Sequence, residues 1–544
     1  MVLKRQIILA AGIVALSVGV SAWSKDEVQA DKRHIKAHMN FLADDLLEGR
    51  ETGSRGYDIA AHYVATQFMQ YGVLPKGERV GYLQSVPLKA TRMVQESPRV
   101  EIIGTNGSVT LTYLDDYLVS GSLLEDSSAV EAPLVFVGYG IEADRFNHHD
   151  YANVDVKGKI VVVLGGKPSS LPTEEGAHFG SGEHKRSMAA ERGAVGMISL
   201  QTPVGEKNFP FVKGREYRFI PSMTWIDAAG KPAHELPAMQ NSIRLSLGAA
   251  QKLFTGVNHK LDDIYAAAVA NRPVPHMDLN LSVRMSRQSV RSDLRSSNVI
   301  GKIEGSDPQL KNEYLVFSAH LDHLGVVKEK SGDNIFNGAM DNASGVAVML
   351  ETARLFAAMP VKPKRSILFV AVTGEEKGLL GSDYFATNPT VPLQAIVANV
   401  NLDMPLLTYD FNNVVAFGAE HSSLKAATAA AMRKMNLELM PDPWPEQGLF
   451  TRSDHYMFVR QGIPSIFLAT GLGSFNKNEN PAALWQEFLA KYYHQPSDDM
   501  GLPLNFDAAA RFAQANFNIG LELANDAQRP SLNKGDFFGD LFRK

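Results

Sequence analysis

A short apolar strand that ends in two histidines and an aspartate constrains this chain more than any other feature. Residues 314–317 form an apolar run, which is typical of a buried strand. His320, Asp322 and His323 follow at its C-terminal end, and Asp341 opens a helical segment further along. Open α/β sheets build their sites outside the carboxyl ends of their strands. The sequence therefore predicts a site at this edge of a sheet.

Strand-like and helix-like segments alternate from residue 298 onward. Such alternation predicts an α/β fold with a mixed, mostly parallel sheet sandwiched by helices. The expected strands are residues 314–318, 367–372, 396–401, 413–417 and 465–468. The expected helices are residues 344–359, 422–435 and 506–524.

The residue pattern before this region differs from the alternation of strands and helices, and it predicts an inserted domain. Residues 31–125 begin with two helical patterns and read as the N-terminal part of the main domain. Residues 126–255 contain β-rich runs bounded by glycine, which predict a small β-rich insertion. The main domain is expected to resume over residues 256–525, followed by a polar C-terminal tail, residues 526–544, to which we assign no function.

Length and composition exclude several classes of protein. A chain of 544 residues is too long for one hydrophobic core, so two or more domains are expected. The net charge of −5, without a long basic run, argues against nucleic acid as a partner. The absence of cysteine excludes disulfides, thiol catalysis and cysteine-based zinc sites.

The N-terminus has the pattern of a signal peptide. Lys4 and Arg5 precede an apolar stretch, residues 7–20, and small residues follow it. We expect cleavage after Ala22, so that residues 1–22 are the signal, with Ala30 as a second candidate position. An uncleaved anchor is the alternative, but the stretch contains two glycines and a serine and barely approaches spanning length. The mature protein is expected to be exported, periplasmic or secreted, without a stable membrane anchor.

Five side chains with metal-binding groups follow predicted strands or open predicted helices. Histidine nitrogens and carboxylate oxygens are the ligands that zinc accepts when no thiol is available. Two histidines and three carboxylates exceed the needs of one catalytic zinc and suit two metals that share a carboxylate. Cobalt or manganese could fill the same ligand set. The five residues are His320, Asp341, Glu376, Asp403 and His494.

Glu375 and Glu376 are adjacent, just after the strand expected at residues 367–372. Neighbouring side chains diverge, so this pair predicts one metal ligand and one general base. A surface pair at a helix N-terminus is the alternative, because acids are favoured there. Asp341 could likewise be an ordinary helix N-cap. Each position alone is a weak signal, and the ordered set favours a metal centre.

Five motifs allow a comparison with known families. They span residues 298–498 and are Ala319-His-Leu-Asp-His, Asp341-Asn-Ala-Ser-Gly, Thr373-Gly-Glu-Glu-Lys-Gly, Asn401-Leu-Asp-Met and Tyr493-His-Gln-Pro-Ser-Asp. With these motifs the chain resembles the M28 family of co-catalytic zinc aminopeptidases, which have a zinc exopeptidase fold. The inserted segment resembles a protease-associated (PA) domain, through Val137-Gly-Tyr-Gly and Gly158-Lys-Ile-Val-Val-Val.

The resemblance implies two Zn²⁺ ions and a role for each ligand. Asp341 would bridge the ions, followed by the cis peptide bond that is common in the family. His320 and Asp403 would complete one metal site. Glu376 and His494 would complete the other.

The resemblance also implies roles for residues that do not bind metal. Glu375 would be the general acid and base. Asp322 would hold the other nitrogen of the His320 imidazole. Tyr493 would stabilise the oxyanion, and a packed aromatic is its alternative. Asp454, in a Ser-Asp-His motif, would orient the site or support the substrate.

The function implied is that of an exported exopeptidase that hydrolyses N-terminal residues from peptides, through a metal-bridging water activated by Glu375. The inserted domain would act as a lid over the cleft. One alternative is a same-fold carboxypeptidase, dipeptidase or glutaminyl cyclase. The cyclase is disfavoured because related cyclases work with a single zinc. The other is a non-catalytic binding protein, but such relatives lose ligands or the base, and this chain has lost none.

Overall fold

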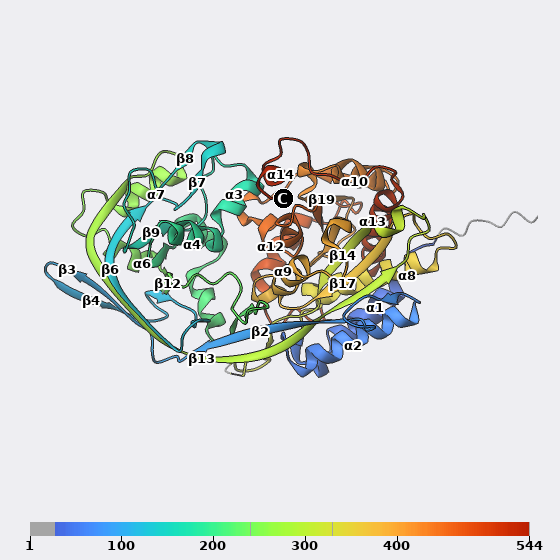
Figure 1. Cartoon of the computed structure of the whole chain (residues 1–544), viewed down its shortest axis with the longest axis horizontal. Helices are drawn as coiled ribbons and strands as arrows, with labels where there is room; N and C mark the ends of the chain where they lie inside the picture. Colours follow the sequence, from blue (N-terminus) through green and yellow to red (C-terminus); the bar gives the residue numbers. More distant parts are fainter. Residues whose placement is uncertain (1–27, 240, 329, 543–544) are drawn as a thin grey trace, which may run out of the picture.

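The structure, a computed structural model, describes residues 28–542 except residues 240 and 329, and it consists of two lobes (Figure 1). The signal peptide expected at residues 1–22 lies outside the described residues. No helix in the described part of the chain combines the length and apolarity that crossing a bilayer requires. Both lobes are α/β, and long strands connect them.

Four parallel strands form the centre of the larger lobe: β17 (Ser366–Val372), β14 (Tyr314–His320), β18 (Ile396–Leu402) and β21 (Ser465–Thr470). β19 (Asn413–Phe417) extends the sheet antiparallel to β21, and β20 (Glu438–Met440) pairs parallel with β19. Every residue of β17 and β18 is buried, as expected for strands covered on both faces. The predicted mixed, mostly parallel α/β sheet is confirmed.

Alternate residues of the central strands face two different layers of helices. Phe317 of β14 packs against Phe356 of α8 (Gly345–Ala358), on the face that also contacts α13 (Phe506–Asn525), α1 (Lys32–Leu42) and α2 (Arg55–Gln70). Val316 faces the opposite layer, where Phe385 and Phe458 pack at 5.9 Å. That layer contains α9 (Leu380–Thr387) and α11 (His455–Val459). The remaining helices of this lobe are α10 (Leu424–Arg433), α12 (Pro481–Lys491) and α14 (Phe537–Phe542).

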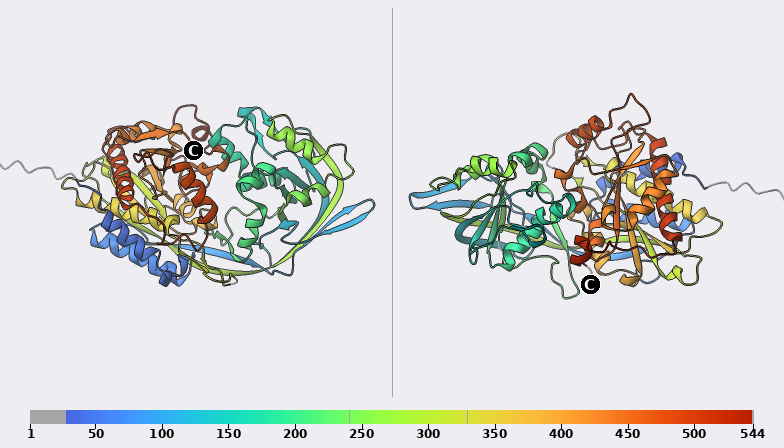
Figure 2. Two further views of the ribbon diagram at one scale, coloured as in Figure 1. Left: turned by 180° about the vertical axis from the view of Figure 1, so that it is seen from behind. Right: turned by 90° about the horizontal axis from the view of Figure 1, so that it is seen from above.

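The strand β13 (His276–Ile303) runs through both lobes and was not predicted. Its first half pairs with β6 (Ser127–Val137) and β3 (Arg99–Gly104) in the smaller lobe. Its second half pairs with β2 (Leu83–Met93) and β17 in the larger lobe. Figure 2 shows β13 and β2 as an arch along one side of the molecule. Many residues of β13 are exposed, so its sequence lacks the apolar run by which a buried strand is recognised.

The smaller lobe has its own mixed sheet. Its parallel strands are β6, β9 (Ile160–Leu164), β10 (Gly196–Leu200) and β12 (Asn241–Leu245), with β4 (Gly107–Leu111) and β5 (Tyr117–Leu118) added antiparallel. The sheet therefore includes residues 99–118 and 276–288, which the expected bounds of 126–255 leave out. Its helices are α3 (Thr173–Gly180), α4 (Gly182–Glu191), α5 (Pro203–Asn208), α6 (Leu247–Lys252) and α7 (Leu261–Val269). The short strands β1 (Leu74–Pro75) and β11 (Ser222–Trp225) pair with β13 and β2. Two small hairpins remain, β7 (Glu142–Ala143) with β8 (His148–His149) in this lobe and β15 (Gly325–Val326) with β16 (Ile335–Phe336) in the larger lobe.

The buried Arg50 ties the N-terminal helices to the strand-end loops of the larger lobe. Its guanidinium donates hydrogen bonds to the carbonyls of Leu321 (2.9 Å), Asn337 (2.7 Å) and Gly338 (3.0 Å), and to that of Leu42. The first three carbonyls belong to the segments that follow β14 and precede α8. Arg50 therefore fixes the relative position of the two segments that carry the first predicted ligands.

His421 joins the two lobes and the C-terminal tail. Its Nε2 lies 2.6 Å from Oε2 of Glu174 on α3, and its Nδ1 lies 2.6 Å from Oδ2 of Asp536 in the tail. Burial opposes the charged imidazolium, but the two carboxylates outweigh it and raise the pKa of His421 to about 10. Phe538 of the tail packs against the same ring at 4.7 Å. The tail is thus part of the contact between the lobes.

This ion triad predicts a pH-dependent stability. The folded pKa of His421 lies above the ordinary value of about 6.5, so its contribution is full below pH 6.5 and is lost as pH rises through the folded pKa. His421→Gln leaves two carboxylates facing one neutral group and should destabilise the fold by about 3 kcal/mol at neutral pH. The thermal unfolding midpoint of the parent should fall between pH 7 and pH 10 more steeply than that of the variant. His62→Gln, at an exposed histidine of α2, is the control, and equal pH slopes for His421→Gln and the parent would contradict the assignment.

Candidate metal centre

The five predicted ligands lie together at the carboxyl edge of the central sheet. His320 ends β14, and Asp341 lies in the irregular turn that leads into α8. Glu376 lies in the turn after β17, and Asp403 directly follows β18. His494 comes from the loop after α12. His320, Glu376 and Asp403 meet because parallel strands present their carboxyl ends at one edge. Asp341 and His494 reach the same edge from the turn before α8 and the loop after α12.

Asp341 faces both histidines through different oxygens. Its Oδ1 lies 3.2 Å from Nε2 of His320, and its Oδ2 lies 3.2 Å from Nε2 of His494. Nε2 of His320 is also 3.1 Å from Oδ1 of Asp403, and Nε2 of His494 is 3.2 Å from Oε2 of Glu376. The cluster therefore has two halves that share one carboxylate.

His323 also reaches this cluster. Its Nδ1 lies 2.6 Å from Oε1 of Glu376 and 4.0 Å from Oδ2 of Asp341, and the side chain is fully buried. These close contacts do not have hydrogen-bond geometry, so both ring nitrogens and Oε1 of Glu376 lack a hydrogen-bond partner. The sequence placed His323 at the strand end, as the last residue of Ala319-His-Leu-Asp-His, but gave it no role.

The charge balance of the centre fits divalent cations. Unpaired charge is costly in a buried site, so excess carboxylates require a counterion. Arg50 is the buried arginine beside them, and its pKa is lowered to about 10 by burial. Two groups of these side chains lie close enough to hold an ion each: His320, Asp341 and Asp403, and His323, Asp341 and Glu376. Their histidine nitrogens and carboxylate oxygens are the donor types that zinc accepts. The buried carboxyl groups of the centre are Asp322, Asp341, Glu375, Glu376, Asp403, Asp454 and Asp498.

The predicted contact between Asp322 and the other nitrogen of His320 is present, but the carboxylate of Asp322 does not make it. The backbone carbonyl of Asp322 lies 3.1 Å from Nδ1 of His320 instead. The carboxylate accepts hydrogen bonds from the backbone N–H of Glu375 (3.1 Å) and Glu376 (3.4 Å) and from the hydroxyl of Thr52 (3.0 Å). The chain leaves the strand after His320, so the Asp322 side chain turns to the free amides of the neighbouring turn. It positions the two glutamates.

Two further side chains form hydrogen bonds to the candidate ligands Asp341 and Asp403, and neither had been given a role from the sequence. Ser453 donates to Oδ2 of Asp403 at 2.5 Å. The carboxylate of Asp498 accepts from the backbone N–H of Met340 (2.8 Å) and Asp341 (3.0 Å), and burial raises its pKa to about 6. Asp498 is the last residue of the motif Tyr493-His-Gln-Pro-Ser-Asp, and this position in the motif could have identified it from the sequence. The expected cis peptide bond after the shared aspartate, Asp341-Asn342, is confirmed.

Glu375 and Tyr493 line the cavity that opens onto the cluster, whose volume is about 480 Å³. Burial, with the carboxylates of Asp403 and Glu376, raises the pKa of Glu375 well above its usual range, against the opposing effect of His320. The Tyr493 ring stacks on His494 with centroids 3.8 Å apart. Burial raises its pKa to about 12, so its hydroxyl is a hydrogen-bond donor at neutral pH.

Asp454 lies behind the cavity wall. The wall includes its neighbours Arg452 and Ser453, whereas both carboxylate oxygens of Asp454 are buried without a hydrogen-bond partner. Burial raises the pKa of Asp454 to about 7. Arg452 and Ser453 are therefore better placed than Asp454 to contact a substrate.

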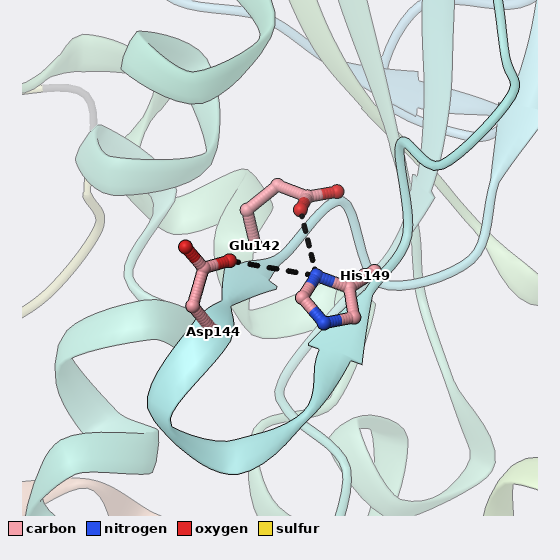
Figure 3. Close-up of side chains that lie close together, drawn as sticks. All are labelled: Glu142, Asp144 and His149. Atoms are coloured by element: carbon pink, nitrogen blue, oxygen red, sulfur yellow. Dashed lines mark hydrogen bonds and ion pairs between the residues drawn. The ribbon is translucent and has the colours of Figure 1, made fainter.

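A third group of potential ligands lies on the smaller lobe, away from this centre (Figure 3). Nδ1 of His149 lies 3.3 Å from Oε2 of Glu142 and 3.5 Å from Oδ1 of Asp144. The Asp144 side chain is 93% exposed. These contacts are accounted for as surface ion pairs.

Comparison with known proteins agrees with this chemistry. Residues 298–519 match the model of Peptidase family M28. A probable zinc metalloprotease of Pyrenophora tritici-repentis is 51% identical over 67 residues, covering 12% of this chain and 15% of that protein. The probable leucine aminopeptidase 2 of Aspergillus oryzae is 27% identical over 281 residues, covering 49% of this chain and 52% of that protein. The chain thus spans about half or less of these curated relatives.

A solved structure extends the similarity to the whole fold. The aminopeptidase from Aneurinibacillus sp. strain AM-1 is similar with a TM-score of 0.54 and 19% identity, over 94% of this chain and 97% of that one. This likeness concerns the fold alone. The family match spans all five predicted ligands. By that match, residues 298–519 are similar to the peptidases of family M28.

Proposed function

We propose that this protein is a di-zinc aminopeptidase that removes N-terminal residues from peptides. The observation that carries the proposal is the shared carboxylate of Asp341, whose two oxygens each face a different histidine. Two-metal hydrolases use such a shared ligand to hold ions about 3.5–4 Å apart. His320 and Asp403 would complete the first site, and Glu376 and His494 the second.

The bound zinc ions would supply Lewis acidity toward the peptide carbonyl and a lowered pKa for water. The residues of the chain do the rest. The Glu375 carboxylate takes a proton from the attacking water and gives it to the departing amine. Its raised pKa suits a group that must hold a proton between these steps. The Tyr493 hydroxyl donates a hydrogen bond to the carbonyl oxygen as that oxygen becomes anionic.

The cavity supports a substrate with an apolar N-terminal side chain. Its wall includes the carboxylates and histidines of the centre, which suit a positively charged free amino terminus. The wall also includes the apolar side chains of Val415, Phe417, Leu449, Phe467 and Ala469. Burying an apolar side chain there would contribute about 1.5–3 kcal/mol to binding.

We also propose that the smaller lobe is a PA-type domain that acts as a lid. Phe209, Lys213, Glu216 and Tyr217 of this lobe line the cavity together with the metal-binding residues. A wall from a second lobe limits how much of a peptide can enter. This supports exopeptidase rather than endopeptidase action.

The catalytic assignment predicts the effect of Glu375→Gln. Loss of the base should lower kcat by about 10²–10⁴-fold on leucyl and phenylalanyl amides, with about two zinc ions retained per chain. The adjacent Glu376→Gln is the matched contrast, because it removes a ligand and should lower the zinc content as well. Hydrolysis of N-blocked but not free-amine peptides by the parent would overturn the aminopeptidase assignment in favour of a carboxypeptidase. Unchanged kcat in Glu375→Gln would overturn the role of the base.

The lid assignment predicts a change in length selectivity. Replacing residues 209–219 with a glycine-serine linker should raise the rate on a hexapeptide relative to that on a dipeptide. The ratio of the two rates is the readout, because any loss of metal affects both substrates alike. Replacing the turn between β3 and β4, far from the cleft, is the control. An unchanged ratio in the first variant would contradict a lid role.

A further inference from the structure

One segment of the smaller lobe touches the metal centre itself. Residues Phe211–Phe219 form an irregular helical turn that leads toward β11. Three side chains of this segment contact the end of α12 or the loop after it, which carries His494. Lys213 donates to the carbonyl of Ala490 at 3.5 Å, and Glu216 accepts from Nε2 of Gln495 at 3.2 Å. The third is Tyr217.

The hydroxyl of Tyr217 lies 2.9 Å from Nδ1 of His494. The other ring nitrogen, Nε2, faces Asp341 and Glu376 at 3.2 Å each. A histidine that binds a metal through Nε2 carries its proton on Nδ1 and needs an acceptor there. The oxygen of Tyr217 is in position to be that acceptor, which fixes both the tautomer and the ring orientation.

The two halves of the centre differ in where this support comes from. Nδ1 of His320 faces the backbone carbonyl of Asp322, 3.1 Å away and within the same lobe. Nδ1 of His494 is supported by a side chain from the other lobe. His320 also lies on a strand, whereas His494 lies in a loop with a positive φ of 57°. The orientation of His494 therefore depends more on Tyr217 than the orientation of His320 depends on the carbonyl of Asp322.

We infer that Tyr217 is a positioning residue for the metal site of Glu376 and His494, so that the smaller lobe completes this half of the centre. This inference rests on the proposed di-zinc function and adds a residue and a lobe to it. Its consequence is that lid position and metal affinity are linked at one of the two sites. Closure of the segment over the cavity supports His494, and its withdrawal removes that support.

The inference is tested by metal binding, which does not require activity. Zinc affinities of the parent and of Tyr217→Phe would be measured by chelator competition on the metal-free full-length protein. Tyr217→Phe should raise the dissociation constant of one zinc by about 10–100-fold and leave the other unchanged. Cobalt absorption spectra of both proteins would report the same change at one of the two ions.

Two controls separate the hydroxyl from the packing of the segment. Glu216→Gln weakens the contact with Gln495 on the same segment but keeps Tyr217, and Tyr113→Phe removes a hydroxyl elsewhere in the smaller lobe that contacts Gln95. Both should keep the affinities of the parent. An equal loss of zinc affinity in Glu216→Gln, or two unchanged zinc affinities in Tyr217→Phe, would overturn this inference but not the proposed function. Failure of the parent to bind two ions would overturn the proposed function and the inference together.

Discussion

The shared carboxylate of Asp341 is the constraint on which the rest of the site depends. A single aspartate can face two histidines only if its backbone is held between them, and several groups hold it there. Asp498 accepts from its backbone N–H, while Arg50 fixes the segments before and beside it. Gly338 allows the tight approach, since a Cβ at this position would lie 2.1 Å from the carbonyl oxygen of Asp341. Buried polar groups of this kind are costly unless each has a partner, and the proposed pair of divalent cations would supply the partners still missing.

The sheet explains why the ligands converge, and the smaller lobe supplies part of the cavity wall. β14, β17 and β18 end at one edge, so residues far apart in sequence meet there. His494 is different because it comes from a loop and meets the smaller lobe through Tyr217. The C-terminal tail and α3 meet at His421, on the contact between the lobes. The contact between the two lobes thus includes both the cavity wall and the C-terminal tail.

The central sheet and the convergence of the candidate ligands at its edge could be predicted because their signals are local. Buried parallel strands read as apolar runs, and the residue just after such a run has a known position in space. The β13 strand could not be predicted, because its exposed residues hide the pattern. Ser453 and Tyr217 act through contacts that the sequence does not encode as spacing, whereas Asp498 closes the motif that carries His494. The contact of Asp322 with His320 was predicted, but the sequence did not indicate that the backbone carbonyl makes it while the side chain accepts from the backbone N–H of Glu375 and Glu376.

The central claim is that this centre holds two ions that share Asp341. Anomalous diffraction from crystals of the zinc-loaded protein, recorded on both sides of the zinc absorption edge, tests it most directly. The account predicts two peaks about 3.5–4 Å apart, one beside His320 and Asp403 and the other beside Glu376 and His494. A single peak in the centre, or two peaks that do not share Asp341, would contradict it.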